Sequence, residues 1–251
     1  MIGTGLENSR KAEDTEHNVA IVLAAGKGSR MHSEIHKQYL SLGGWPVLCH
    51  SLSAFETFSE VQEVILVTGK EEIPYCREQI VKAYGFQKVT KIIAGGAERY
   101  HSVFQGLRVV EKCDYVFIHD GARPFVDQPM LRRVLAGVRQ YEACVVGMPV
   151  KDTIKVADRN GFAVQTPDRS SLWMIQTPQV FSYSLIKEAY ERLMRSEERG
   201  VTDDAMVLER MTGHLVKLLE GSYENIKITT PEDLAIAQAF LRRKAKNVEK
   251  N

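Results

Sequence analysis

The chain has 251 residues, of which 44% are hydrophobic and 26% charged, a balance ordinary for a globular protein. Its formal net charge is only +1 at pH 7, so no overall field attracts it to nucleic acid or to a membrane surface. The four cysteines are far apart and form no C-x-x-C pair, which indicates neither a zinc site nor a redox motif. Unpaired cysteines of this kind are typical of a reducing compartment, and we expect a cytoplasmic protein.

Residues 1–17 are polar and charged, without the apolar stretch of a secretory signal. We expect them to form a disordered N-terminal extension. No apolar run later in the chain approaches the length of a membrane span. Residues 18–245 are therefore expected to form one domain.

The first predicted strand is the apolar run at residues 21–25, which breaks into Gly26-Lys27-Gly28-Ser29-Arg30. Glycines have no Cβ, so backbone N–H groups at this turn can approach a ligand closely. A concave set of such groups favours anions, and Lys27, Arg30 and Lys37 add positive charge. The combination suits a nucleoside triphosphate, although a plain turn with solvated basic residues is a comparable interpretation. Met31 stands where the dinucleotide fingerprint has its third glycine, and no P-loop motif is present.

Strands and helices then alternate along the chain. Strands are predicted at 63–68, 88–94, 114–119 and 143–149, and helices at 45–58, 71–84, 98–111 and after Pro129. This alternation is typical of βαβ units in a parallel sheet, where ligands bind beyond the carboxyl ends of the strands. Gly26-x-Gly28, Gly95-Gly96 and Asp120-x-x-Arg123 each follow a predicted strand, so we expect them to meet at one edge.

The pattern changes between residues 151 and 175, where strands at 153–157 and 162–166 flank an Asn160-Gly161 turn. We interpret this segment as a β-arm that projects from the sheet. Helices at 184–195 and 205–211, strands at 215–219 and 225–229, and a final helix beginning at Thr230-Pro231 follow.

Several polar groups have two interpretations each. Asp120 and Arg123 suit a hydroxylated, phosphorylated substrate, and equally an internal pair that shapes the loop. Gly95-Gly96 with Ser102 suits a base or ribose, and equally a helix entry. Thr202-Asp203-Asp204 is most simply a helix cap.

Taken in order, these motifs resemble the 2-C-methyl-D-erythritol 4-phosphate cytidylyltransferase family over about residues 18–241. The resemblance rests on LAAGKGSRM with HKQYL, and on GGAERYHSV, HDGARPFV, PVKDTIKV, QTPQVF, TDDA and NIKITTPEDL. It implies a Rossmann-like fold of the nucleotidyltransferase type, with a mostly parallel sheet flanked by helices and a projecting β-arm.

The resemblance also implies the reaction and its partners. The family transfers CMP from CTP to 2-C-methyl-D-erythritol 4-phosphate in non-mevalonate isoprenoid biosynthesis, releasing pyrophosphate with the help of Mg²⁺. It further implies a homodimer formed through the arm, so that each site borrows residues from the partner.

The roles that the resemblance assigns fall into three groups. The catalytic residues are Arg30, Lys37, Arg169 and Lys227. The nucleotide-binding residues are Ala24, Ala25, Gly26, Gly28, Gly96 and Ser102. The acceptor-binding residues are Asp120, Arg123, Thr153, Arg169 and Lys227, with Asp120 also a candidate metal ligand.

Three alternatives remain at this point. Ribitol-5-phosphate cytidylyltransferases share much of the pattern, although the run Leu172–Gln179 lacks the tyrosine and Gly-Gln expected there. A nucleotide-binding regulatory protein that has lost catalysis is the second. A dinucleotide-dependent oxidoreductase is the third, disfavoured by Met31.

Overall fold

The protein is built on a seven-stranded sheet, seen in a computed structural model that describes residues 16–26, 36–197 and 200–248. The strand order is β11-β7-β10-β6-β1-β4-β5, and every neighbouring pair is parallel except the two that involve β10. The strands are β1 (Asn18–Leu23), β4 (Glu63–Thr68), β5 (Val89–Ala94), β6 (Tyr115–Asp120), β7 (Ala143–Pro149), β10 (Trp173–Ser182) and β11 (Lys217–Glu220). The predicted mostly parallel α/β sheet is confirmed.

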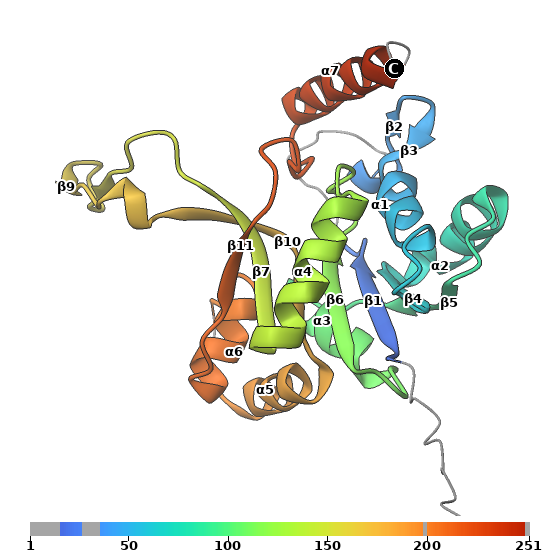
Figure 1. Ribbon diagram of the computed structural model, residues 1–251, viewed down its shortest axis with the longest axis horizontal. Helices are drawn as coiled ribbons and strands as arrows, with labels where there is room; N and C mark the ends of the chain where they lie inside the picture. Colours follow the sequence, from blue (N-terminus) through green and yellow to red (C-terminus); the bar gives the residue numbers. More distant parts are fainter. Residues whose placement is uncertain (1–15, 27–35, 198–199, 249–251) are drawn as a thin grey trace, which may run out of the picture.

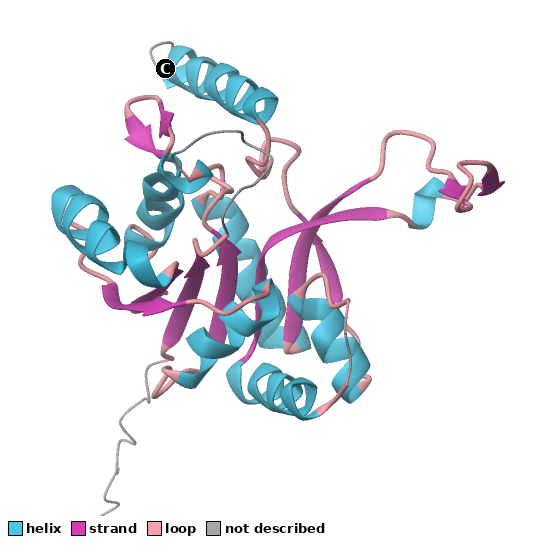
Figure 2. Cartoon of the chain, turned by 180° about the vertical axis from the view of Figure 1, so that it is seen from behind, coloured by secondary structure: helices cyan, strands magenta, loops and turns pink. Residues whose placement is uncertain are grey.

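Helices cover both faces of this sheet (Figure 1, Figure 2). One face carries α1 (Val47–Glu56), α2 (Ile73–Tyr75) with the π-helix η4 (Cys76–Lys82), and α4 (Gln128–Tyr141). The other carries α3 (Arg99–Arg108), α5 (Tyr183–Arg195) and α6 (Asp204–Thr212). Successive side chains of a strand point to opposite faces, so β1 contributes Ala20 and Val22 to the first core. Val19 and Ile21 enter the second.

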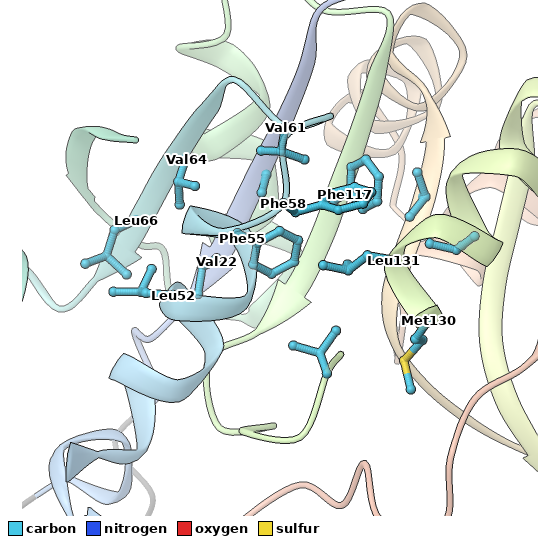
Figure 3. Close-up of a cluster of buried hydrophobic side chains, with 14 of the residues drawn as sticks. Val22, Leu52, Phe55, Phe58, Val61, Val64, Leu66, Phe117, Met130 and Leu131 are labelled. Carbon is cyan, nitrogen blue, oxygen red and sulfur yellow. The ribbon is translucent and has the colours of Figure 1, made fainter. Parts of the chain in front are cut away.

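The first core is centred on three phenylalanines, shown in Figure 3 with Val22 and Leu52 beside them. The Phe117 ring meets Phe55 and Phe58 edge to face, with centroids 6.2 and 6.1 Å apart. Full burial of a side chain of this size contributes about 1.5–3 kcal/mol to folding. This packing holds β1 and β6 together and so fixes the position of their carboxyl ends.

Strand β10 is absent from the sequence-based prediction. It inserts antiparallel between β6 and β7, although its middle reads Gln176-Thr177-Pro178-Gln179 and resembles a loop. The ladder with β7 shifts register between Ile175 and Gln179, and this irregularity accommodates a proline that has no N–H to donate. The first three residues of β10, at 173–175, fall within the segment predicted as the arm.

Three smaller predictions are also corrected. The first strand is Asn18–Leu23, so Ala24 and Ala25 lie beyond its end. The first helix begins at Val47, because Trp45–Pro46 (β3) pairs with Ser41–Leu42 (β2) in a hairpin. The predicted strand at 225–229 is not part of a sheet, and Ile228 N donates to the carbonyl of Ala122, in the loop after β6, at 2.9 Å.

The arm comprises residues 151–172 between β7 and β10, and it projects far from the sheet (Figure 1). Its strands β8 (Val156–Ala157) and β9 (Ala163–Gln165) pair antiparallel around Gly161, whose φ of +86° suits glycine. Side chains at its tip are exposed, Phe162 by 71% and Val164 by 63%. The predicted projecting hairpin is confirmed.

The last helix, α7 (Pro231–Val248), packs on a third apolar cluster that contains Leu42, Phe125 and Ile228. Within the described ranges, no helix combines the length and the apolar character needed to cross a bilayer.

Candidate functional site

A cavity opens at the carboxyl edge of the sheet, beyond the ends of β1, β5 and β6. Its lining includes Ala24, Ala25, Gly26, Lys37, Gly96, Ser102, Asp120 and Lys227. The structure thus brings to one place residues that lie up to about 200 positions apart in the chain. Gly28 and Arg30 lie outside the described residues.

Lys37 reaches this cavity because the 3-10 helix η2 (Lys37–Tyr39) is attached to the end of β1. The buried Gln38 amide donates from Nε2 to the carbonyl of Ala24 at 2.6 Å. The Ala24 N–H in turn donates to the carbonyl of Val67 on β4 at 2.6 Å. Strand end and lysine are therefore positioned by one set of hydrogen bonds.

Gly95 and Gly96 allow the opposite wall to come close. A Cβ on Gly95 would lie 2.6 Å from the Ala25 Cβ and 2.7 Å from the Ser102 Oγ, and a Cβ on Gly96 would clash with His101. The Gly96 N–H donates to the Ser102 Oγ at 3.0 Å. Because these positions are glycines, the backbone and the Ser102 hydroxyl lie close together at the wall of the cavity.

Asp120, the last residue of β6, is the centre of a charged cluster. Its Oδ1 accepts from Arg99 Nε at 3.2 Å, and its Oδ2 lies 2.8 Å from Lys227 Nζ and 3.7 Å from Arg123 Nε. We call Arg99, Asp120, Arg123 and Lys227 the Asp120 cluster. Burial favours a raised pKa at Asp120, but Arg99, Lys227 and Arg123 outweigh burial and lower the pKa well below its usual range. The cluster therefore has three cations around one ionised carboxylate.

His119 and Thr177 are linked to Asp120 by hydrogen bonds. The Thr177 hydroxyl accepts from the Asp120 N–H at 3.0 Å and lies 3.1 Å from His119 Nδ1. The hydroxyl proton is thus directed to Nδ1, and the other ring nitrogen donates to the Arg123 carbonyl at 3.1 Å. Complete burial lowers the pKa of His119 to about 4, in agreement with a neutral ring.

Lys227 is held by the segment before α7. The Arg123 guanidinium donates to the carbonyl of Asn225 at 2.8 Å, and the Asn225 amide donates to the carbonyl of Thr177 at 2.9 Å. On the far side, the Asp233 carboxylate caps α7 by accepting from the N–H groups of Thr229 and Thr230. Lys227 thus lies between Asn225, which is held by Arg123 and Thr177, and the capped start of α7.

A second cavity adjoins the first, and Arg99, Asp120 and Lys227 line both. Its other walls include Arg123, Gln176, Thr177, Gln179, Asp203 and Glu209. The Asp120 cluster therefore forms the wall between two spaces, an arrangement suited to a reaction between two bound molecules.

The sequence prediction assigned no role to Arg99. Its guanidinium contacts Asp120 and makes a two-point contact with the buried Asp204, at 2.9 and 2.8 Å. The available signal was an arginine three residues after the strand-end glycines. Asp203 is the helix cap that the sequence suggested, since its Oδ1 accepts from the Met206 N–H.

Thr153 and Arg169 lie apart from both cavities. Each is exposed on the arm, and the Arg169 guanidinium donates to the carbonyl of Lys151 at 2.9 Å. Within one chain, these two residues do not meet the other predicted site residues.

The described part of the chain contains no group of three His, Cys, Asp or Glu side chains arranged to hold a metal ion. Asp120, the candidate ligand, has both oxygens engaged by cationic side chains. A carboxylate in that environment does not fit a resident divalent cation.

Comparisons with known proteins identify the family to which this chain is similar. Residues 18–243 match the family model for 2-C-methyl-D-erythritol 4-phosphate cytidylyltransferase. A relative of that name from Lachnospira eligens is 55% identical over 226 residues, covering 90% of this chain and 99% of the relative. Another, from Lachnoclostridium phytofermentans, is 48% identical and covers 90% of this chain and 97% of its own.

Solved structures show the same likeness. The 4-diphosphocytidyl-2C-methyl-D-erythritol synthase of Anaerococcus prevotii superposes with a TM-score of 0.80 at 34% identity, covering 91% of this chain and 97% of that one. The Thermus thermophilus cytidylyltransferase gives a TM-score of 0.72 at 29% identity, over 90% and 99% of the two chains. The chain therefore belongs to the 2-C-methyl-D-erythritol 4-phosphate cytidylyltransferase family and is a nucleotidyltransferase of non-mevalonate isoprenoid biosynthesis.

Proposed function

We propose that the two adjoining cavities bind CTP and 2-C-methyl-D-erythritol 4-phosphate, and that CMP passes between them at the Asp120 cluster. A phosphate oxygen of the acceptor attacks the α-phosphorus of CTP, and the bond to the pyrophosphate breaks. The products are 4-diphosphocytidyl-2-C-methyl-D-erythritol and pyrophosphate. The observation that carries the proposal is that Lys227 and Asp120 line both cavities while Lys37 lines the first.

The attacking oxygen is already anionic, so the reaction needs no general base. Catalysis consists of positioning and of stabilising the charge that develops on the phosphates. We assign charge stabilisation to Lys37 and Lys227, together with Arg30 from outside the described residues. We assign the nucleotide side to Ala24, Ala25, Gly26, Gly96 and Ser102, which line the first cavity, together with Gly28 from outside the described residues.

The acceptor is assigned to the second cavity. An isolated carboxylate at Asp120 repels a phosphate, but the three cations of the cluster leave a net positive charge there. Arg123 and Lys227 are suited to the acceptor phosphate, and Asp120 to its hydroxyl groups.

Mg²⁺ is proposed to arrive with the substrate. In nucleotide enzymes Mg²⁺ is commonly held by substrate phosphates with few protein ligands. That role requires no resident carboxylate site, and the charge it brings reduces repulsion between the two phosphorylated substrates.

A release assay for pyrophosphate tests the reaction. With CTP and Mg²⁺, we expect release that requires 2-C-methyl-D-erythritol 4-phosphate and is at least 100-fold slower with ribitol 5-phosphate. Equal rates with ribitol 5-phosphate contradict the acceptor assignment, and release without any acceptor contradicts the transfer itself.

We further propose a homodimer in which the arm brings Thr153 and Arg169 to the partner's site. The support is that both residues are distant from the cavities of their own chain, while the arm exposes Phe162 and Val164. Mixed dimers of Lys37→Ala and Arg169→Ala chains test the exchange. If arms are exchanged, one site of each mixed dimer keeps both residues, and about half of the activity per dimer returns.

The assay is run with the acceptor well below its KM, where both parents are impaired, and mixed dimers with only the average activity of the two parents show that Arg169 acts within its own chain. A cytoplasmic location is also proposed, because both substrates are charged metabolites. Activity that sediments with the membrane fraction of lysed cells contradicts it.

A further inference from the structure

A group of buried polar side chains that the proposed function does not use adjoins the Asp120 cluster through Arg99. Asp204 is completely buried at the first turn of α6, and both of its oxygens are engaged by the guanidinium of Arg99, the first residue of α3. The buried Tyr190 hydroxyl of α5 donates to the Asp204 Oδ1 at 2.5 Å. Three helices thus meet at one ion pair, of which the Asp204 carboxylate is completely buried.

Asp204 is itself fixed in place by the backbone. Its N–H and that of Ala205 both donate to the Gln179 Oε1 of β10, at 3.0 and 2.9 Å. Removing a buried ion pair in favour of apolar packing is often neutral or stabilising, so such pairs are weak evidence of a purely stabilising role. The way in which Asp204 holds the Arg99 guanidinium indicates a role in orienting that group.

The guanidinium group is planar, so fixing two of its nitrogens fixes the direction of the third. Asp204 holds both terminal nitrogens of Arg99, and the remaining Nε donates to the Asp120 Oδ1 at 3.2 Å. Asp120 then offers its other oxygen to Lys227 Nζ at 2.8 Å.

A competing partner for Asp120 lies close by. Arg123 Nε is buried without a hydrogen-bond partner and is 3.7 Å from the Asp120 Oδ2. Without Arg99, the carboxylate is free to rotate towards this donor, and Lys227 then loses its partner. A shift of about 1 Å in a positioning group is enough to cost about 100-fold in rate.

We propose that Arg99, held by Asp204 and Tyr190, is a positioning residue that fixes the Asp120 carboxylate and through it the Lys227 ammonium between the two cavities. The inference rests on the proposed function for its kinetic consequence, but not for its geometry. It assigns to the second aspartate of Thr202-Asp203-Asp204 a part in acceptor turnover, while the first caps the helix.

Asp204→Asn is the main variant, because it removes the charge that holds Arg99 and does not line either cavity. We expect kcat/KM for the acceptor to fall about 10- to 100-fold, with the KM for CTP changed less than 3-fold. Tyr190→Phe removes only the outermost hydrogen bond and is expected to have a smaller effect in the same direction. Equal losses for both substrates, in proportion to a lowered Tm, indicate a structural pair and overturn the proposal.

Chemical rescue provides a readout that fold stability does not change. Arg99 lines both cavities, so guanidinium ions can enter the space left by Arg99→Ala. We expect millimolar guanidinium to restore at least 10-fold of the lost turnover. Arg108→Ala, on the exposed side of the same helix, is the matched control and is expected to show neither loss nor rescue. Absence of rescue together with full activity of Arg99→Lys contradicts the two-point geometry.

Amine labelling tests the geometry without any turnover. In Asp204→Asn we expect the acetylation rate of Lys227 to rise several-fold, while that of the exposed Lys82 stays constant. An unchanged Lys227 rate overturns the positioning role. If the wild-type chain releases no pyrophosphate with either acceptor, the proposed function fails, and labelling still decides the inference.

Discussion

The predicted acceptor-binding residues are divided between two regions, the Asp120 cluster and the arm, and these regions differ in how firmly they hold their side chains. The cluster is partly buried at the sheet edge, and its members are held by side chains and backbone from β6, β10, α3 and the segment before α7. The arm is exposed along most of its length, and the Arg169 guanidinium donates to the carbonyl of Lys151, within the arm itself. The residues of the cluster are held in place within one chain, whereas Thr153 and Arg169 of the arm line neither cavity of their own chain, as the proposed exchange of arms requires.

The difference has an energetic side. Charges fixed in advance need no reorganisation when the phosphates react, which is the main source of electrostatic catalysis. An exposed hairpin adds little to the stability of its own chain, so its residues are free to serve an interface. Four changes test whether this division holds.

Lys37→Ala is expected to have the largest effect, a loss of about 100- to 1000-fold in kcat. The reason is that η2 holds Lys37 at the cavity, where we propose that its charge stabilises the charge developing on the phosphates. Steady-state pyrophosphate release measures it, with the exposed Lys82→Ala as control. Turnover within 3-fold of the wild type removes Lys37 from the mechanism.

Arg169→Ala is expected to raise the KM for the acceptor by about 10-fold, with a smaller change in kcat. A ground-state contact made by the arm affects binding more than chemistry. Saturation curves for each substrate separate the two, and the exposed Arg159→Ala of the same arm is the control. A change in the KM for CTP alone shows that Arg169 contacts the nucleotide and contradicts its assignment to the acceptor.

The buried histidine next to the Asp120 cluster makes the stability of the fold depend on pH. His119 has its pKa lowered from 6.5 to about 4 by burial, so the unfolded chain binds more protons than the folded one between these values. Stability therefore falls as the pH falls from about 6.5 to 4, by up to about 3 kcal/mol from this residue.

Urea unfolding of the wild type and of His119→Gln across this range measures the effect. The variant cannot titrate and is expected to show a shallower slope, whatever its absolute stability. His50, whose pKa is also lowered by burial, is present in both proteins and cancels in the comparison. Identical slopes show that His119 is not neutral in the folded chain.

Phe162→Ser at the tip of the arm is expected to have the smallest effect on the chain itself. A surface substitution of this kind changes the free energy of unfolding by about 0.5 kcal/mol or less. Dimer dissociation measured by sedimentation is expected to become easier, since an exposed aromatic side chain is lost from the proposed interface. A large loss of monomer stability contradicts the view of the arm as structurally independent.

The sequence determined most of the alternating strands and helices, because each buried strand is an apolar run and each helix has its own periodicity. It also placed Gly96, Asp120 and Lys37 near one another, since residues that follow parallel strands share an edge. The motifs of the chain, in order, were sufficient to identify the family that the comparisons confirm.

Only the tertiary structure revealed β10, because the polar run around Pro178 is stabilised by neighbours on both sides and not by its own propensity. The contact between Arg99 and Asp204 is also visible only in the tertiary structure. The two residues are 105 positions apart, and their contact depends on how α3 and α6 pack. Local pattern follows from the chemistry of adjacent residues. Long-range charge pairing follows from burial, which no local pattern records.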